Sequence, residues 1–345
     1  MEVTAHPIEG AFDLPEWQEL LEADPNRHVF ATPEWSRLWW NRFGEGKQEG
    51  LVLTFSDPGT VALAALTIDR TEEGRRVRFL GGDDLTDYQG PLIASERHRP
   101  AVAEAFIRYL VETFDDWDYL EAKGLPVPFH FSEWLVEAAD RMKLRFELEL
   151  HELTAVLMLP DSWDTYLAGL GKKKRHELER KTRRFEREAP DAVLRSTGDE
   201  TLEADIEAFI RLHKTSAGEK GEFMLPAREE FFREIARTLQ PMGMLALDFL
   251  ELDDKPIAAT ISFRYDNVFY LYNSAYDLTL RPISPGLILV SRLIQRSIGE
   301  KARRFDFLRG RERYKYDLGA EALPLHWILI RHPSGMATES GRPSK

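Results

Sequence analysis

The sequence predicts an α/β protein, of α+β type with a mixed sheet, in which two similar domains follow one another. Short apolar segments typical of strands recur along the chain, and longer amphipathic segments typical of helices separate them. Residues 245–252 and 257–265 are a predicted strand pair, with Asp253 and Asp254 at the hairpin turn between them. A further strand at 268–275 and the helix that follows it extend this pair into a β-α-β unit.

The two halves of the chain share one order of segments, which indicates a duplicated unit. The tripeptide Asp-Leu-Thr lies between a strand and a helix at 84–86 and again at 277–279. A strand follows the helix at 117–120 in the first copy and at 305–308 in the second. The offset between the copies changes by only a few residues from segment to segment, which chance similarity explains poorly.

The length and composition suit two domains. A chain of 345 residues with 43% hydrophobic residues can bury two cores of ordinary size. We expect an N-terminal domain in residues 1–155 and a C-terminal domain in residues 156–335, with a linker near 150–160. The chain from Pro333 to Lys345 is rich in Gly, Ser and Pro, and residues 336–345 are expected to form a flexible tail.

The composition also excludes several kinds of site and partner. The absence of cysteine rules out disulfides, thiolate metal ligands and a Cys-acyl intermediate, and the nine scattered histidines predict no metal site. A formal charge of -13 argues against binding to DNA. No apolar run reaches the roughly 18 residues that span a bilayer, and the N-terminus lacks the pattern of a signal peptide. We therefore expect a cytoplasmic protein without a membrane span.

The strongest functional signal is the turn at Pro285 and Gly286, which opens an amphipathic helix. Such a turn exposes backbone N–H groups, and the helix dipole makes this end positive, so that the site suits a phosphate group. The backbone of the preceding strand could bind the amides of a pantetheine arm, so these features together outline a site for an acyl-CoA. Its expected contacts are Asn273, Ser274, Arg281, Ser284, Gly286 and Leu287.

Over residues 159–330 the chain resembles a known family, the GNAT-type acyl-CoA N-acyltransferases. It is similar to their tandem-domain branch, which includes cellulose-biosynthesis-associated acetyltransferase-like proteins and, more distantly, the Fem-type peptidoglycan aminoacyl ligases. The phosphate loop of the family reads Q/R-x-x-G-x-G/A, and here Ser284 replaces the middle glycine between Arg281 and Gly286. The resemblance rests on Ser284-Pro285-Gly286, Phe305-Asp306-Phe307, Arg309-Gly310, Tyr314-Lys315 with Gly319, and the basic run 171–187.

The resemblance implies two tandem GNAT-like domains, of which the N-terminal one is degenerate and the C-terminal one holds the cofactor. It implies direct transfer of an acyl group, expected to be acetyl, from acetyl-CoA or another acyl-CoA to an amine of a small molecule, glycan or peptide. Two alternatives stay open. One is a Fem-type aminoacyl-tRNA-dependent ligase, the only case with tRNA as a partner. The other is a catalytically degenerate binding protein in polysaccharide or envelope biosynthesis.

Proton transfer has several candidate residues. Tyr314 resembles in position the GNAT tyrosine that donates a proton to the leaving thiolate, although it could instead be a packed aromatic residue. His213 and Asp306 are candidate bases for the attacking amine, with Glu219 as a further candidate. His213 could instead be a helix cap or a surface group. Asp306 could instead be a structural carboxylate bonded to the backbone.

The segment from Lys172 to Glu188 is strongly basic, with nine Lys or Arg residues against four Glu residues. One interpretation is a solvated helix face held by pairs such as Glu177 with Lys181. The other is a clamp for an anion, namely the 3′-phosphate of CoA, an acidic glycan or a tRNA acceptor stem. The expected substrate or anion contacts are Lys172, Lys173, Arg175, Lys214, Arg309 and Lys315.

Overall fold

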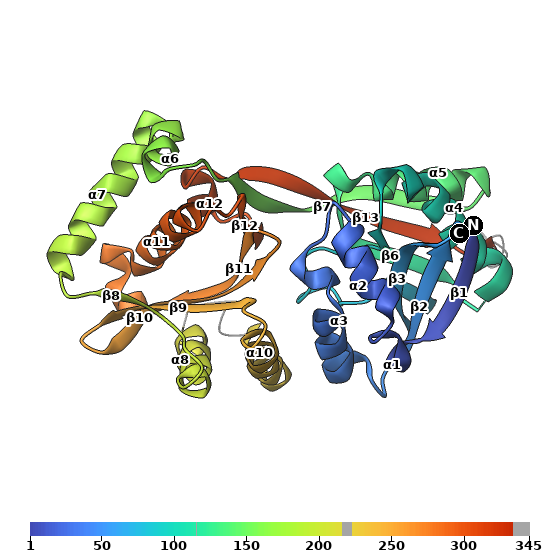
Figure 1. Cartoon of the computed structure of the whole chain (residues 1–345), viewed down its shortest axis with the longest axis horizontal. Helices are drawn as coiled ribbons and strands as arrows, with labels where there is room; N and C mark the ends of the chain where they lie inside the picture. Colours follow the sequence, from blue (N-terminus) through green and yellow to red (C-terminus); the bar gives the residue numbers. More distant parts are fainter. Residues whose placement is uncertain (115, 216–222, 334–345) are drawn as a thin grey trace, which may run out of the picture. The chain divides into compact units, whose positions relative to one another are not determined.

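The computed structural model describes residues 1–114, 116–215 and 223–333, which fold into two compact units (Figure 1). The first unit contains Met1–Leu153 and the segment that begins at Leu323, and the second unit is Thr154–Ala322. The tail expected at 336–345 lies outside the described residues.

The first unit is built on a mixed sheet with strand order β1-β2-β3-β4-β6-β13 and the short β5 beside β3. Neighbouring strands are antiparallel except β4 and β6, which are parallel. The strands are β1 (Glu2–Pro7), β2 (Glu49–Ser56), β3 (Thr60–Thr71), β4 (Gly74–Phe79), β5 (Leu92–Ile93), β6 (Tyr119–Pro126) and β13 (Glu321–Arg331). The α-helices are α1 (Ile8–Ala11), α2 (Pro15–Ala23), α3 (Pro33–Trp39), α4 (Arg99–Tyr109) and α5 (Phe131–Arg141). Shorter helical turns are η1 (Val29–Ala31), η2 (Trp40–Gly44), η3 (Glu96–His98), η4 (Leu110–Phe114) and η5 (Val127–Phe129).

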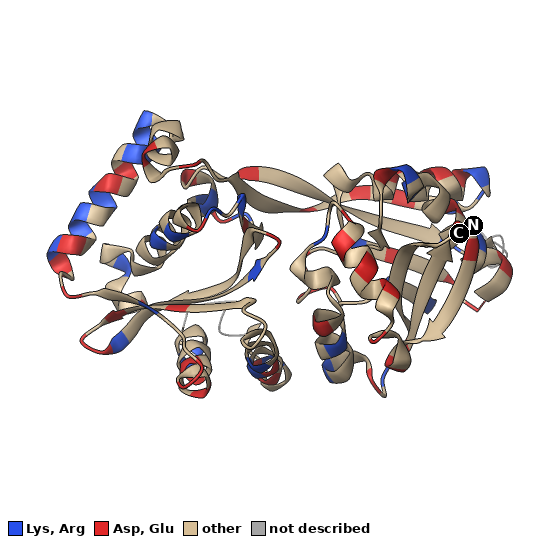
Figure 2. Cartoon of the chain, in the orientation of Figure 1, with Lys and Arg blue, Asp and Glu red and all other residues tan. Residues whose placement is uncertain are grey.

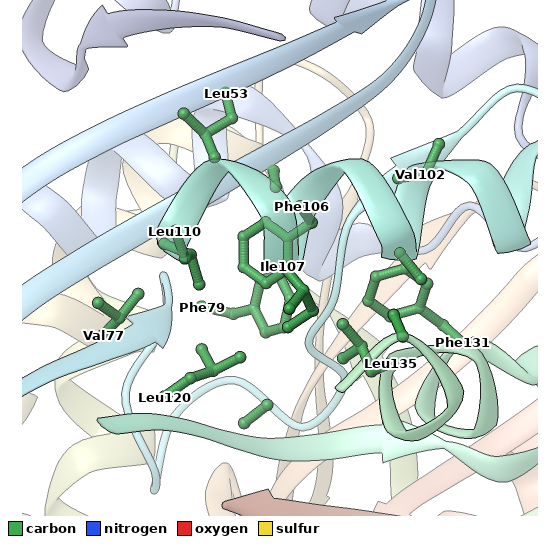
Figure 3. Packing of buried hydrophobic residues seen from close by; sticks show 14 of the residues in the cluster. Leu53, Val77, Phe79, Val102, Phe106, Ile107, Leu110, Leu120, Phe131 and Leu135 are labelled. Carbon is green, nitrogen blue, oxygen red and sulfur yellow. The ribbon is translucent and has the colours of Figure 1, made fainter. Parts of the chain in front are cut away.

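The core of the first unit forms where α4 packs on the sheet (Figure 3). Phe106 of α4 stacks on Phe79 of β4, with ring centroids 5.8 Å apart. Ile328 and Ile330 of β13 are fully buried in the same core, although they come from the other end of the chain. Because burying each side chain of this size contributes about 1.5–3 kcal/mol, β13 is needed for the stability of this unit.

The second unit is also a mixed sheet, with strand order β7-β12-β11-β10-β9-β8. Only β11 and β12 are parallel neighbours. The strands are β7 (Arg145–Met158), β8 (Val193–Ser196), β9 (Leu245–Leu252), β10 (Lys255–Tyr265), β11 (Val268–Tyr276) and β12 (Arg304–Arg309). The helices are α6 (Trp163–Gly169), α7 (Lys172–Glu188), α8 (Leu202–Lys214), α10 (Pro226–Leu239), η6 (Leu278–Ile283), α11 (Pro285–Gly299) and α12 (Arg313–Asp317).

Helices cover both faces of the second sheet. Figure 1 shows α8 and α10 on one face and α11 and α7 on the other. The predicted hairpin is confirmed, because β9 and β10 pair across a turn at Asp253 and Asp254. These residues have φ of 51° and 58°, as a tight hairpin turn requires.

The sheet order confirms the duplicated unit. In each unit a hairpin, β2–β3 or β9–β10, leads to a strand that pairs in parallel with the strand after a crossover helix. The strand after α5, which is β7, then pairs through residues 154–158 with β12 of the second unit. The strand after α12, which is β13, pairs with β6 of the first unit. The last strand is therefore exchanged between the two copies.

This exchange changes the domain limits read from the sequence. The segment near 150–160, expected as a linker, is mostly strand β7. The expected C-terminal range of 156–335 includes residues from Leu323 onward, which lie in the first unit. Alternating apolar residues at Phe146, Leu148 and Leu150 are typical of the extended strand that the structure contains.

The exchange predicts how fragments of the chain behave. Residues 1–153 alone lack β13 and its buried isoleucines, so we expect no cooperative unfolding transition in denaturant. Joining residues 323–333 to this fragment through a flexible linker should restore the transition. Circular dichroism during urea unfolding measures both, and a cooperative transition of the shorter fragment alone would contradict the role of β13.

Candidate active site

The sheet of the second unit opens between β11 and β12. Their recorded parallel pairing ends at Tyr270 and Asp306, although β11 continues to Tyr276 and β12 to Arg309. The register of β11 with β10 is also irregular just beyond this point. Here β11 has one extra residue, Tyr272, opposite the step from Ile261 to Ser262 of β10. Ligands of α/β folds bind at the carboxyl ends of parallel strands, which is where this opening lies.

Asp306 maintains the bend of β12 at this opening. Its side chain is fully buried, and its Oδ1 accepts a hydrogen bond of 2.9 Å from the backbone N–H of Leu308. Leu308 has φ of 57°, and the register of β12 with β7 is irregular next to it. Nη2 of Arg304 lies 3.6 Å from Asp306 Oδ2. Because the carboxylate is committed to these two groups, the geometry favours the structural role of Asp306 over that of a base.

Helix α11 begins beside the same strand end. Ser284, just before the helix, has φ of 58° and ψ of 47°, the left-handed conformation that glycine adopts most easily. Ser284, which stands where the family pattern has glycine, thus adopts a backbone conformation that favours glycine. A Cβ on Gly286 would lie 3.1 Å from the ring of Tyr276, so the lack of a side chain there also serves internal packing.

The start of α11 can bind an anion. The first intrahelical hydrogen bond is donated by Ile288 N–H to the Ser284 carbonyl, so that the N–H groups of Gly286 and Leu287 have no acceptor within the helix. Arg281 of η6 is exposed, and no ion pair is recorded for it within the described part of the chain. These groups together suit a pyrophosphate.

Tyr314 of α12 lies against the other side of the opening. Its ring centroid is 6.2 Å from that of Phe307, and its hydroxyl shares a hydrogen bond with Ser274 at the end of β11. Burial raises the pKa of Tyr314 well above the usual value, and the Glu312 carboxylate raises it further, whereas the Ser274 hydrogen bond lowers it. The phenol is therefore protonated at neutral pH and can donate a proton.

His213 of α8 contacts the neighbouring residue of β11. Its Nε2 lies 2.9 Å from Oδ1 of Asn273, and the same Oδ1 accepts a hydrogen bond of 3.0 Å from Ser274 N–H. Because a backbone N–H always donates, the Asn273 atom between them must be the oxygen, and His213 must donate from Nε2. Neutral His213 then carries its lone pair on Nδ1. Asn273 therefore fixes the tautomer of His213. The side chain is buried, with only 1% exposed, so His213 is not the surface group that the sequence also allowed.

Lys315 is hydrogen-bonded to the backbone of Arg309 at the loop that follows β12. The ammonium group of Lys315 is buried, lies 3.1 Å from Glu312 Oε2 and donates a 2.6 Å hydrogen bond to the Arg309 carbonyl. Lys315 therefore holds this loop in place. The sequence suggested that Lys315 contacts a substrate anion, but its ammonium group is not placed to do so. Lys214 is similarly engaged, because it forms an ion pair of 2.7 Å with Glu229.

Three residues of α7, namely Lys172, Lys173 and Arg175, were also expected to bind anions. Lys172 and Lys173 are exposed, and no ion pair is recorded for either within the described residues. Arg175 lies 3.9 Å from Glu179. The candidate base Glu219 falls within residues 216–222, outside the described ranges.

The corresponding opening of the first unit is occupied by its own chain. The recorded pairing of β4 and β6 ends at Val77 and Leu120, as in the second unit. Here, however, Gln89 N–H donates a 3.0 Å hydrogen bond to the Gly124 carbonyl of β6. A Cβ on Gly124 would lie 3.1 Å from the Asp87 carbonyl oxygen, so this segment packs closely on the strand. The end of β6 is therefore bonded to its own chain in this unit.

Comparisons with known proteins agree with this architecture. Residues 172–316 match the family model for the acetyltransferase (GNAT) domain. A structure of FemX superposes with a TM-score of 0.66 at 10% identity, covering 98% of this chain and 100% of that chain. A tandem GNAT protein from the clavulanic acid biosynthesis pathway superposes with a TM-score of 0.52 at 14% identity, covering 96% and 99%.

A third structure, from Agrobacterium fabrum, is the C-terminal domain of a putative lysylphosphatidylglycerol synthetase. It superposes with a TM-score of 0.55 at 12% identity and covers 94% of both chains. No curated protein sequence matches the chain. The domain match and these structural likenesses confirm the resemblance to the GNAT-type superfamily and the tandem GNAT-like fold. At these low identities the likenesses to solved structures establish the fold alone.

Two further properties concern metals and membranes. Within the described residues no cluster of three or more His, Asp or Glu side chains could hold a metal ion. Among the described helices, none has both the length and the apolar character needed to cross a membrane.

The left-handed conformation of Ser284 makes a prediction about stability. Replacing Ser284 by Gly should raise the free energy of unfolding by about 0.5–1 kcal/mol, because relief of backbone strain exceeds the added entropy of the unfolded chain. Ser284→Ala keeps the Cβ and should give no gain. Urea unfolding of the two variants tests this, and a loss of stability in Ser284→Gly would show that the position is not strained.

Proposed function

Because residues 172–316 form a GNAT domain within a tandem GNAT-like fold, we propose that the protein is an acyl-CoA-dependent N-acyltransferase. The observation that carries this proposal is the opening between β11 and β12, which adjoins the start of α11. A strand edge and a helix N-terminus in this arrangement fit the two parts of CoA, an amide-containing arm and a pyrophosphate. The acyl group is acetyl or another short acyl group.

The donor site would be formed by the end of β11 and the start of α11. The backbone at Asn273 and Ser274 would hydrogen-bond the pantetheine amides. The N–H groups of Gly286 and Leu287, with Arg281, would bind the pyrophosphate. Ser284 would shape this loop through its left-handed backbone rather than through a charge. An acyl-CoA donor places the proposed reaction in the cytoplasm.

The side chains next to the opening have complementary proton-transfer roles. Acyl-CoA, when bound, supplies the acyl group as an activated thioester. His213, oriented by Asn273, accepts at Nδ1 the proton that the attacking amine loses. Tyr314 holds a proton on its hydroxyl and donates it to the leaving thiolate. The chain has no cysteine, so a Cys-acyl intermediate plays no part.

The expected alternatives differ in donor. The likeness to FemX supports a Fem-type aminoacyl-tRNA-dependent ligase as the second candidate. A third candidate is a degenerate GNAT-like binding protein in polysaccharide or envelope biosynthesis. Calorimetry with acetyl-CoA and with aminoacyl-tRNA separates them: the proposal requires acetyl-CoA binding, and exclusive binding of aminoacyl-tRNA would replace it with the Fem-type function. Binding without thioester consumption by any of a panel of amines would favour the third candidate.

Substituting Tyr314 tests the proposed chemistry. Tyr314→Phe should lower turnover by about 10²-fold and leave acetyl-CoA affinity nearly unchanged, because the lost proton donation matters only along the reaction path. Tyr316→Phe on the same helix is the matched control and should keep normal turnover. Release of free thiol from acetyl-CoA measures both.

The pH dependence gives this test an independent readout. Because burial raises the pKa of Tyr314, the phenol stays protonated as pH rises past the usual phenol pKa of about 10. Ionisation of Tyr314 should therefore not lower turnover between pH 8 and about pH 10. Unchanged turnover in Tyr314→Phe, with a loss of thermal stability instead, would make Tyr314 a structural residue.

A further inference from the structure

An open basic groove of about 840 Å³ lies between α7 and α12. Its walls carry five cationic side chains but only two carboxylates, so the groove has an excess positive charge in a chain of net charge -13. Figure 2 shows Lys and Arg gathered at the N-terminal end of α7. The cationic residues are Lys172, Lys173, Arg180, Lys181 and Arg313.

The carboxylates of the groove compensate only part of this charge. Glu177 lies 2.8 Å from Arg180 and 3.7 Å from Lys181, and it is shared between them. Asp317 lies 3.4 Å from Arg313. Within the described part of the chain, no ion pair is recorded for Lys172 or Lys173. The uncompensated charge is therefore concentrated where α7 begins.

The charge at the start of α7 opposes the helix dipole. Four consecutive cations occupy residues 172–175, and no acidic residue lies in the first turn. Helices α8 and α10 each have an acidic residue in the first turn, which the dipole favours, whereas α11 has neither an acidic nor a basic residue there. Cations at the start of a helix are repelled by the positive end of its dipole, which makes the helix less stable. A bound anion would offset this repulsion.

The groove adjoins the reaction end of the proposed active site. Lys174 Nζ donates a 2.8 Å hydrogen bond to the Tyr316 carbonyl, which ties the start of α7 to α12. Arg313 and Asp317 of α12 line the groove, whereas Tyr314 of the same helix packs toward Phe307 and Ser274. A ligand in the groove would therefore lie one helix away from the proton donor.

The lining of the groove favours phosphate over nucleobases. No Phe, Tyr or Trp side chain lines it, whereas proteins that bind single-stranded nucleic acids stack bases on such rings. Adjacent Lys and Arg side chains present several N–H donors, which suit phosphate oxygens. The ligand chemistry that fits best is a compact group with several phosphate charges.

We propose that this groove binds the phosphate-bearing part of the acceptor whose amine is acylated, an inference that rests on the proposed function. The donor phosphates would lie at the start of α11, so the two substrates use different cationic residues. The acceptor is thereby assigned to amines that carry a diphosphate or similar polyanionic group.

Inorganic tripolyphosphate is a suitable probe for calorimetry on the full chain. Lys172→Ala/Lys173→Ala should weaken its affinity by about 10-fold and flatten the dependence of affinity on salt. The matched control is Arg183→Ala/Arg187→Ala on the same helix outside the groove, which should change affinity by less than about 2-fold. Acetyl-CoA affinity should be equal in both double variants.

Each contrary result has a distinct meaning. Failure of the probe to bind, or equal losses in both double variants, would overturn the groove as a site. Competition between tripolyphosphate and acetyl-CoA, with acetyl-CoA weakened in Lys172→Ala/Lys173→Ala, would assign the groove to the donor and overturn the acceptor assignment. Binding of a short RNA duplex but not of tripolyphosphate would overturn it in favour of a nucleic-acid backbone. Probe binding without acetyl-CoA binding would support the phosphate site while the proposed function fails.

Discussion

The hydrogen bond from Leu308 N–H to the buried carboxylate of Asp306 is the constraint on which the candidate site depends. It holds Leu308 in a left-handed conformation at the point where the register of β12 with β7 is irregular. An unpaired buried N–H at this point would cost about 1–3 kcal/mol, so the carboxylate makes an otherwise unfavourable bend stable. The irregular register of β11 adds to the separation from the other side. The opening is thus formed by backbone geometry, and the side chains around it are placed by that geometry.

The two copies of the duplicated unit use the same opening differently. In the second unit the opening is flanked by His213 with Asn273 and by Tyr314 with Ser274. In the first unit the segment containing Gln89 crosses the corresponding position and bonds to β6. A filled opening satisfies backbone groups internally and stabilises the fold, whereas an open one leaves them available to a ligand. The exchange of β7 and β13 makes the two copies depend on one continuous chain.

Much of the fold follows from local sequence patterns, but the contacts of the site do not. Strand alternation, the Asp253 turn and the helix after Pro285 are local signals, and the structure contains all three elements. The exchange of strands depends on pairing between distant segments, which periodicity does not encode. The bond between His213 and Asn273 joins residues that are 60 positions apart in the chain, and Ser274 likewise contacts Tyr314 of a distant helix. Lys315 illustrates the same limit, because its charge suggested an anion contact while Glu312 and a carbonyl oxygen enclose it.

The central claim is that the opening of the second unit, and not that of the first, receives the CoA arm. Hydrogen exchange of backbone amides with and without saturating CoA tests it most directly. The account predicts slower exchange at Gly286, Leu287 and residues 273–276, with no change in residues 80–91 of the first unit. Protection confined to the first unit, or no protection anywhere despite saturating CoA, would contradict the account.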